Sequence, residues 1–587
     1  MAIAGIMEEP KDALNDGKAL ANPTEKDIEG SVPESTPAPS ELEPVVTLKT
    51  WIVVCFLSFG YGLCFWPVPT AAAVGTLVSA DFGQPNAYVW FVPAWTISVT
   101  ISFMIGGANT DLLGRRWFLV GGNLLCVVGH LIAGASKQTG NPNMITAGMA
   151  LAGFGGGFCQ MAAFALPELL PNKWRHIGII IADGTVYITI LIAPITARYS
   201  YEFANWEWNF YAPAIFQFAS FLGLFFLYFP PAHPSGLPLL QALRKIDYIG
   251  ILLFTTSTVP ILTGIVWAGI HPATSPHVLA SLTSGFALLL LFGLWETYGQ
   301  TPHPLAPTRI FAAGRGRDFT APALALSITN MFYYSSSILW PTMTTVFYTS
   351  GGADWVRATV LTLPQGMAIC GGAAGLAAFG ARIHGVGIGW RWQLVAATVV
   401  VVVFGALLGL ATPTNMGVMC AFLVVSQTAF AWAVPLSIML SQLGVRHEDL
   451  GISGGVSGSL RFAGSAVATT VYQTIFNNEV AKWTPKLVVP AALDAGLDQA
   501  RSAELLAVVG TSQLATASFS PAVVAAASEA LKWAYCKGIF VVSMSSMGFG
   551  IVAIIACLMC KDVESKMTNT IDVYLENDEF AHRNKVH

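Results

Sequence analysis

Two ionisable side chains lie within stretches of the chain that are otherwise apolar and long enough to cross a lipid bilayer. Asp183 lies in the stretch Ile177–Ile195, and Arg461 lies in the stretch Leu450–Phe476. A charge inside the hydrocarbon layer is costly unless it is paired or neutralised, and such residues often mark the path of a proton or a substrate. Burial there disfavours the ionised form of a carboxyl group. The sequence therefore predicts that Asp183 binds and releases a proton.

Both residues also have simpler interpretations. Asp183 could be a carboxylate that is hydrogen-bonded at the edge of a water-filled cavity. Arg461 could bind an anionic or carbonyl-rich ligand, or it could form an ion pair that is purely structural. If the helices bring the two residues together, Arg461 would favour the ionised form of Asp183, which makes both of them candidates for proton coupling.

A charged turn links the apolar stretches Tyr88–Gly106 and Trp117–Ala135. Its notable residues are Gly107, Asp111, Gly114, Arg115 and Arg116. The glycines permit a tight backbone and a close approach of helices, whereas the charges must remain at the level of the lipid headgroups. For the two arginines, the alternative is an ordinary positively charged cytoplasmic turn. Glu168, near the end of another apolar stretch, could pair with either arginine or be an ordinary surface acid.

Polar and aromatic side chains inside the apolar stretches are candidates for lining a substrate cavity. Aromatic walls with few charges suit a bulky, mostly apolar ligand that carries hydroxyl or carbonyl groups. For aromatic residues near the end of a span, the alternative is a place in the belt at the membrane surface. The candidates are Trp95, Gln160, Tyr187, Asn330, Tyr333, Tyr334, Trp340, Gln365 and Gln427.

The composition argues against a soluble enzyme. Of the 587 residues, 54% are hydrophobic and only 11% are charged, and the mean hydropathy is +0.60. The net charge of -4 gives no argument for binding to nucleic acid. The sequence has no phosphate-binding loop of the form G-x4-G-K-[ST] and no recognisable catalytic or metal-binding cluster. We therefore expect no enzymatic activity, no cofactor, no metal and no direct use of ATP.

Fourteen apolar stretches have about the 20 residues that a helix needs to cross a bilayer. They group as six, two and six, separated by a Pro- and Gly-rich link at Pro230–Pro238 and by a polar link before Phe319. The stretches are Leu48–Val74, Tyr88–Gly106, Trp117–Ala135, Met144–Leu166, Ile177–Ile195, Phe210–Phe229, Ile246–Trp267, His277–Trp295, Phe319–Phe347, Val356–Phe379, Trp392–Leu410, Gly417–Leu440, Leu450–Phe476 and Cys536–Cys560.

Lysine and arginine are concentrated in alternate short loops, among them the loops that hold Arg115, Arg175 and Arg446. Positive charge in short loops favours the cytoplasmic side. We therefore expect these loops to be cytoplasmic and, because the number of spans is even, both termini to be cytoplasmic as well. The long Pro- and Ala-rich stretch 477–535 is then expected to be an external loop, which could contain one amphipathic helix.

The spacing Gly107-x3-Asp111-x2-Gly114-Arg115-Arg116 resembles the loop between the second and third helices of the major facilitator superfamily (MFS). That resemblance implies that Asp111 lies against the N-terminus of a helix of the opposite half and thereby stabilises one conformation. We call Gly107, Asp111, Gly114, Arg115, Arg116 and Glu168 the latch residues.

Two further segments resemble particular MFS groups. Arg244–Gly250 resembles the start of the inserted helix pair of fourteen-span drug:proton antiporters, and Ala165–His176 resembles the fungal trichothecene efflux pump group, which is close to the siderophore transporters. The resemblance implies an all-α polytopic membrane protein with two six-helix bundles and two inserted central helices. It also implies export of a hydrophobic secondary metabolite, such as a trichothecene, or of a drug, across the plasma membrane in exchange for protons. A vacuolar or vesicle membrane is the alternative location.

The expected organisation is a disordered cytoplasmic tail over 1–46, a six-helix bundle over 47–230, a linker with two inserted helices over 231–300, a second bundle over 301–560 and a cytoplasmic tail over 561–587. The expected partners are a small hydrophobic substrate, protons and the lipid bilayer. Import of ferric siderophores and sensing of a nutrient without transport are the competing functions. Short tails argue against the sensor, and short external loops without His and Tyr clusters argue against the importer.

Overall fold

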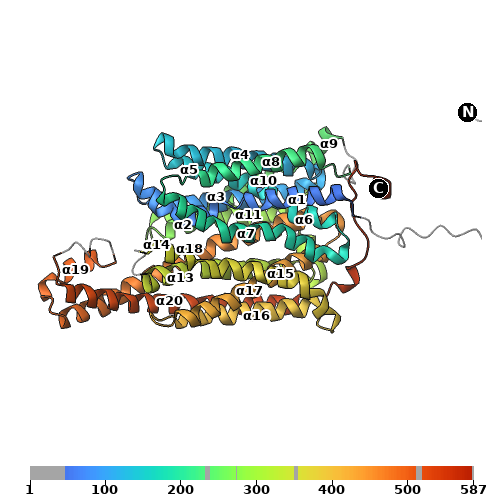
Figure 1. The fold of residues 1–587 in the computed structure, drawn as a ribbon. Coiled ribbons are helices and arrows are strands. Elements are labelled where there is room, and N and C mark those ends of the chain that lie inside the picture. The colour runs from blue at the N-terminus through green and yellow to red at the C-terminus, as the bar shows by residue number, and fades with distance from the viewer. Residues whose placement is uncertain are drawn as a thin grey trace, which may run out of the picture. The chain divides into compact units, whose positions relative to one another are not determined.

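The computed structural model describes residues 46–231, 238–272, 274–349, 354–510, 514 and 518–584. The tail predicted over residues 1–46 therefore lies almost wholly outside the described residues. Pro44–His587 form one compact unit. Within the described ranges the regular structure is helical, apart from one isolated bridge between Ile246 and His303 (Figure 1).

The first part of the chain forms a group of helices that we call the N-half. Prolines and glycines divide this group: Pro67 starts α2, and Gly114, with a φ of 82°, ends α3. The helices are α1 (Leu48–Leu63), α2 (Pro67–Asp81), α3 (Phe91–Leu113), α4 (Arg116–Thr139), α5 (Asn143–Gln160), α6 (Ala162–Glu168), α7 (Arg175–Glu202) and α8 (Trp208–Leu227).

The last part of the chain forms the C-half. Its helices are α12 (Thr308–Ala312), α13 (Thr320–Met343), α14 (Trp355–Val360), α15 (Leu363–Gly385), α16 (Trp390–Leu407), α17 (Met416–Gly444), α18 (Leu450–Asp494), α19 (Ser502–Val508) and α20 (Pro521–Met559). Between the halves the chain forms α9 (Leu239–Lys245), α10 (Tyr248–Ala268) and α11 (Pro276–Tyr298). The inserted helices α10 and α11 pack on each other, and α10 also contacts α3 of the N-half and α18 of the C-half.

Twelve helical stretches of the described residues are long and apolar enough to cross a membrane. Two other long helices, α13 and α18, are not among them because they are more polar. Both lie within the bundle, where α13 contacts α17, α18 and α20, and α18 contacts α3. A helix surrounded by other helices does not face lipid and can carry more polar side chains. With these two helices, the structure is consistent with the predicted count of about fourteen.

The stretch 477–535, expected to be a loop, is largely helical. Helix α18 continues without a break to Asp494, and α20 begins at Pro521. The end of α18, α19 and the start of α20 share a small apolar core that includes Val488, Leu505 and Val523. Figure 1 shows this helical hairpin projecting beyond the bundle at the left. The apolar residues that stabilise it are contributed by three separate helices, so their pairing is not evident from composition.

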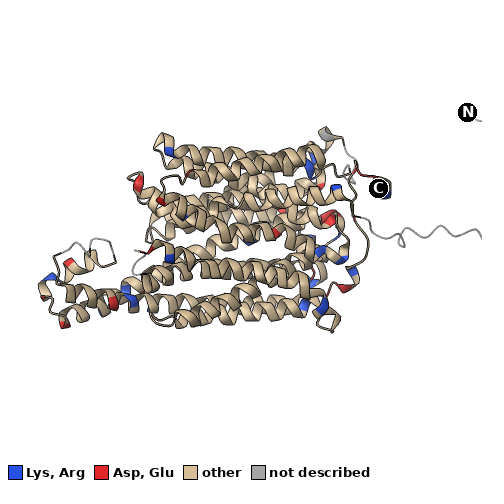
Figure 2. Cartoon of the chain, viewed as in Figure 1, with Lys and Arg blue, Asp and Glu red and all other residues tan. Residues whose placement is uncertain are grey.

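The two ends of the bundle differ in charge. Figure 2 shows more Lys and Arg at the right-hand end of the bundle, where the C terminus lies, than at the left-hand end of the bundle. The right-hand end holds the end of α3, the end of α6 and the start of α18, which contain or adjoin Asp111, Glu168 and Gly451. We call it the latch end.

Candidate functional site

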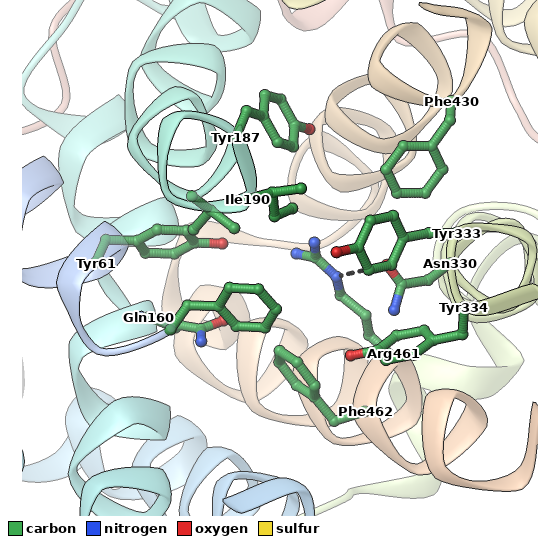
Figure 3. A pocket seen from close by; sticks show the side chains of 12 residues that line it. Tyr61, Gln160, Tyr187, Ile190, Asn330, Tyr333, Tyr334, Phe430, Arg461 and Phe462 are labelled. Atoms are coloured by element: carbon green, nitrogen blue, oxygen red, sulfur yellow. Dashed lines mark hydrogen bonds between the residues drawn. The ribbon is translucent and has the colours of Figure 1, made fainter. Parts of the chain in front are cut away.

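A narrow cavity lies between the two halves (Figure 3). Helices of both halves supply its lining, so the cavity depends on how the halves pack. The N-half residues are Tyr61, Phe65, Gln160, Val186, Tyr187 and Ile190. The C-half residues are Asn330, Tyr333, Tyr334, Phe430, Arg461 and Phe462.

Asp183 and Arg461 form an ion pair that joins the halves beside this cavity. The guanidinium Nη1 of Arg461 lies 3.8 Å from Oδ1 of Asp183, whose side chain is fully buried. The hydroxyl of Tyr61 donates a hydrogen bond of 2.6 Å to Oδ1, and that of Tyr187 donates one of 3.4 Å to Oδ2. Two such hydrogen bonds and a nearby cation supply polar partners for both carboxyl oxygens of this buried side chain. The structure thus brings together the two residues that the sequence named for proton coupling.

Arg461 also has a partner within its own half. Its Nε donates a hydrogen bond of 3.4 Å to Oδ1 of Asn330 on α13, and Asn330 in turn donates one of 2.6 Å to Oγ of Ser465. Figure 3 shows the guanidinium pointing across the cavity toward Tyr61. The side chain of Arg461 therefore connects a cavity-facing amide with the buried carboxylate of the opposite half.

Five of the nine predicted cavity residues line the cavity: Gln160, Tyr187, Asn330, Tyr333 and Tyr334. The other four, Trp95, Trp340, Gln365 and Gln427, are buried in helix packing instead. Each donates a side-chain hydrogen bond to a neighbour: Trp95 to the carbonyl of Cys64, Trp340 to that of Leu361, Gln365 to Ser337 and Gln427 to Ser336. A polar group in an apolar helix can thus be satisfied by packing alone.

Sequence reasoning missed half of the lining. Tyr61, Phe65, Val186, Ile190, Phe430 and Phe462 line the cavity without having been named. Tyr61 had a usable signal, because it is a polar aromatic residue between Gly60 and Gly62 in an apolar helix. Phe462 directly follows Arg461 and could have been considered with it. The others are ordinary apolar residues of their helices and carry no such signal.

Asp111 caps a helix of the opposite half, as the resemblance implied. The backbone N–H of Gly451 donates to Oδ1 of Asp111 at 3.0 Å, and that of Ile452 donates to Oδ2 at 2.9 Å. These amides belong to the first turn of α18, where the helix dipole favours a negative charge. Arg115 lies 3.6 Å from Asp111 and also forms an ion pair with Glu168. The charged turn of the N-half thereby holds the start of a C-half helix.

Two glycines make this contact possible. A Cβ atom on Gly107 would lie 2.5 Å from Cα of Gly455, so α3 and α18 touch backbone to backbone.

Arg116 has a different role from that of Arg115. It donates a hydrogen bond of 2.8 Å to the carbonyl of Phe225 and stacks over the ring of Phe229, so it stays within the N-half.

Among the described residues, no group of three or more His, Cys, Asp or Glu side chains is arranged to hold a metal ion. The site therefore consists of a cavity with mostly aromatic walls, one ion pair between the halves, and a carboxylate that caps a helix across the same boundary. The two walls of the cavity thus belong to different halves of the molecule, which are joined beside the cavity and at the latch end.

Residues 40–587 match the family described as fungal trichothecene efflux pump (TRI12). The chain belongs to this family. It is 53% identical over 554 residues to the MFS-type transporter prx5 of Penicillium rubens, a match that covers 94% of this chain and 98% of that protein. It is 24% identical to the trichothecene efflux pump TRI12 of Fusarium sporotrichioides, over 91% of this chain and 90% of that one.

Solved structures with the same fold are also transporters. The proton:xylose symporter XylE bound to 6-bromo-6-deoxy-D-glucose superposes with a TM-score of 0.54 at 12% identity, covering 88% of this chain and 95% of XylE. The human organic anion transporter MFSD10 gives a TM-score of 0.51 at 13% identity, covering 87% and 98%. At these identities the likeness shows the fold alone. The predicted MFS fold and family are confirmed, and the protein is a multi-pass membrane protein of the MFS efflux-transporter type.

Proposed function

We propose that the protein exports a bulky, mostly apolar secondary metabolite with oxygen functions, similar to a trichothecene, in exchange for protons. The observation that carries this proposal is the ion pair between Asp183 and Arg461. It joins the two halves beside the cavity, and one of its members can be neutralised by a single proton. The names of the relatives support the substrate class, since they include trichothecene efflux pumps.

The lining of the cavity fits such a substrate. Seven of its twelve residues are aromatic: Tyr61, Phe65, Tyr187, Tyr333, Tyr334, Phe430 and Phe462. Aromatic faces bind an apolar ring system, and the hydroxyls together with Asn330 and Arg461 supply donors for carbonyl, epoxide or hydroxyl oxygens. Arg461 is the strongest of these donors, because it is charged and lies in the lining itself.

In the proposed mechanism, Asp183 takes up the proton. Protonation removes the negative charge that attracts Arg461, which weakens the bond between the halves and frees the guanidinium for a substrate oxygen. Loss of the proton restores the ion pair and draws Arg461 back to Asp183. Tyr61 and Tyr187 hold the carboxyl group in place in both states, through the hydrogen bonds that their hydroxyls form with it.

Apart from Arg116, which contacts only N-half residues in the part of the chain that the structure describes, the latch residues have the complementary role of stabilising one conformation. Asp111 and α18 hold the latch end closed, and Arg115 and Glu168 fix the turn that carries Asp111. We place the latch end on the cytoplasmic side of the plasma membrane, because the short loops at this end carry most of the positive charge. Both ends of the chain then lie in the cytoplasm.

The direct test is transport in proteoliposomes that contain the purified protein, with a labelled trichothecene and an imposed pH gradient. We expect the substrate to move against its concentration gradient and opposite to the protons, and to stop when a protonophore removes the gradient. Liposomes without protein are the control. Movement with the protons instead would indicate an importer, as expected of a siderophore transporter. Binding of the substrate without any transport would indicate a sensor.

A further inference from the structure

The C-terminal segment Lys561–Asn584 lies along the latch end of the bundle (Figure 1). Most of it is irregular, with only two short 3₁₀ turns. The sequence predicts nothing more than a cytoplasmic tail here. The segment is nevertheless bonded to both halves of the transporter, first to the C-half through residues 561–566 and then to the N-half through residues 568–576.

Its contacts with the N-half are made largely by the backbone. The N–H of Asn172 donates to the carbonyl of Thr570 at 3.0 Å, and the N–H of Glu576 donates to the carbonyl of Phe229 at 2.8 Å. The N–H of Val573 donates at 3.1 Å to the carbonyl of Glu168, one of the latch residues. The segment is thus fixed to the N-half directly beside the latch.

Its contacts with the C-half are made earlier in the segment and are mostly charged. The ammonium group of Lys566 donates to the carbonyl of Leu443 at the end of α17 at 2.5 Å. The carboxylate of Glu564 lies 2.8 Å from Nε2 of His384 on α15. The segment therefore spans the boundary between the halves on the outside of the closed end.

One side chain of the segment reaches into that boundary. Oδ2 of Asp572 accepts a hydrogen bond of 2.7 Å from Nη2 of Arg175, whose side chain is only 4% exposed. Arg175 of the N-half lies 3.5 Å from Oε1 of Gln442 on α17, and Gln442 donates a hydrogen bond of 2.9 Å back to the carbonyl of Ala163. Asp572 supplies the negative charge for this network. A buried guanidinium that loses its carboxylate is strongly disfavoured.

We propose that the C-terminal segment is a strap that holds the latch end closed and regulates how readily this end opens. If the halves separate at the latch end, the segment cannot keep its contacts with both, so it must detach from one of them. Its bonds with the C-half, made by Lys561, Glu564 and Lys566, are few and partly exposed, which permits detachment from that half. The inference rests on the proposed function only in assuming that the latch end opens during transport.

The test measures the separation of the halves at the latch end in the full-length protein, in lipid nanodiscs and without substrate or a pH gradient. Spin labels are placed by Trp117→Cys on α4 and Val386→Cys after α15, whose side chains are 61% and 81% exposed. Native cysteines that react with the label are replaced by serine. The distance distribution between the labels then reports the fraction of molecules in which this end is open.

We expect Asp572→Asn to raise the open fraction about tenfold, because it leaves the buried Arg175 without its carboxylate. The matched control is Glu579→Gln, which removes one negative charge from an exposed position of the same segment and should leave the distribution unchanged. Truncation after Lys561 should have a larger effect, and a synthetic peptide of residues 562–584 should reverse it.

An unchanged distance distribution for both Asp572→Asn and the truncated chain would overturn the proposal. So would an equal shift for Asp572→Asn and Glu579→Gln, because that would indicate a general effect of charge. These results do not depend on transport. If Asp572→Asn and the truncation open the latch end but a pH gradient drives no substrate transport, the proposed function is wrong. The proposed role of the C-terminal segment is then still supported.

Discussion

The latch end and the central cavity hold the two halves together by different means. At the latch end, the halves are joined by helix-cap hydrogen bonds from Gly451 and Ile452 to Asp111. Backbone contact at Gly107 and the C-terminal segment add to these bonds. Beside the cavity, one ion pair between Asp183 and Arg461 crosses the boundary. The latch end therefore combines many small contributions. Near the cavity, the ion pair is accompanied by uncharged contacts between the halves, such as that of Phe462 with Trp95, and we propose that protonation of Asp183 weakens the ion pair.

This difference separates two tasks of a transporter. Backbone hydrogen bonds and helix packing at the latch end set the relative stability of the closed conformation, whatever the cavity holds. In the proposed mechanism, the ion pair beside the cavity responds to protons through Asp183 and to the substrate through Arg461, which is part of the cavity lining. The following substitutions distinguish the two regions, from the largest expected effect to the smallest.

Replacing Arg461 by methionine should destabilise the protein most. The change leaves the carboxylate of Asp183 buried without its cation, which typically costs about 3–5 kcal/mol. The melting temperature of the purified protein measures the loss. The double variant Arg461→Met with Asp183→Asn should recover most of it, because no unpaired charge then remains. Strictly additive effects of the two changes would show that the pair is not coupled.

Aromatic residues inside and outside the cavity should respond differently. Trp340 is fully buried in packing, so Trp340→Ala should lower stability by about 3–5 kcal/mol. Tyr334 lines the cavity, so Tyr334→Ala should instead weaken substrate binding, by about 1 kcal/mol or roughly fivefold in Kd, with a smaller change in melting temperature. Calorimetric titration and thermal unfolding measure the two quantities. Equal loss of folded protein in both variants would assign Tyr334 to packing.

A smaller effect is expected at the latch. Asp111→Asn removes a charge from the N-terminus of α18, and such a charge is worth about 0.3–2 kcal/mol. The open fraction at the latch end, measured with the same pair of labels, should rise severalfold. Arg116→Ala is the matched control in the same turn, because the described contacts of Arg116, with Phe225 and Phe229, lie within the N-half, and it should leave the open fraction unchanged. A shift of similar size in the control would mean that the turn acts through its overall charge.

Sequence patterns identified single residues at both regions, but not all of their partners. A charged residue in an apolar stretch can be recognised from the sequence alone, so Asp183 and Arg461 were predicted as functional residues. Their pairing requires parts of α7 and α18 to come close together, although the two residues are 278 positions apart in the chain. The spacing around Asp111 resembles a family pattern, and that resemblance also implied that Asp111 contacts the N-terminus of a helix of the opposite half. Tyr61, which donates a hydrogen bond to Asp183, was missed although its position between Gly60 and Gly62 in an apolar helix offered a signal.

Some polar residues misled the sequence analysis for a physical reason. Gln427 and Trp340 look like cavity residues, because a polar group in lipid would be costly. In the structure, neighbouring helices satisfy them through Ser336 and the carbonyl of Leu361. The helical hairpin within 477–535 and the bonds of the C-terminal segment were likewise not predictable, since both depend on contacts between distant parts of the chain.

The most direct test of proton coupling is Asp183→Asn in proteoliposomes. Asparagine has the shape of the protonated carboxyl group and cannot release a proton, while Arg461 keeps its contact with Asn330. We predict that the variant binds substrate and exchanges labelled for unlabelled substrate across the membrane, but that an imposed pH gradient no longer drives net transport. If Asp183→Asn still concentrates the substrate in response to a pH gradient, Asp183 is not the coupling site.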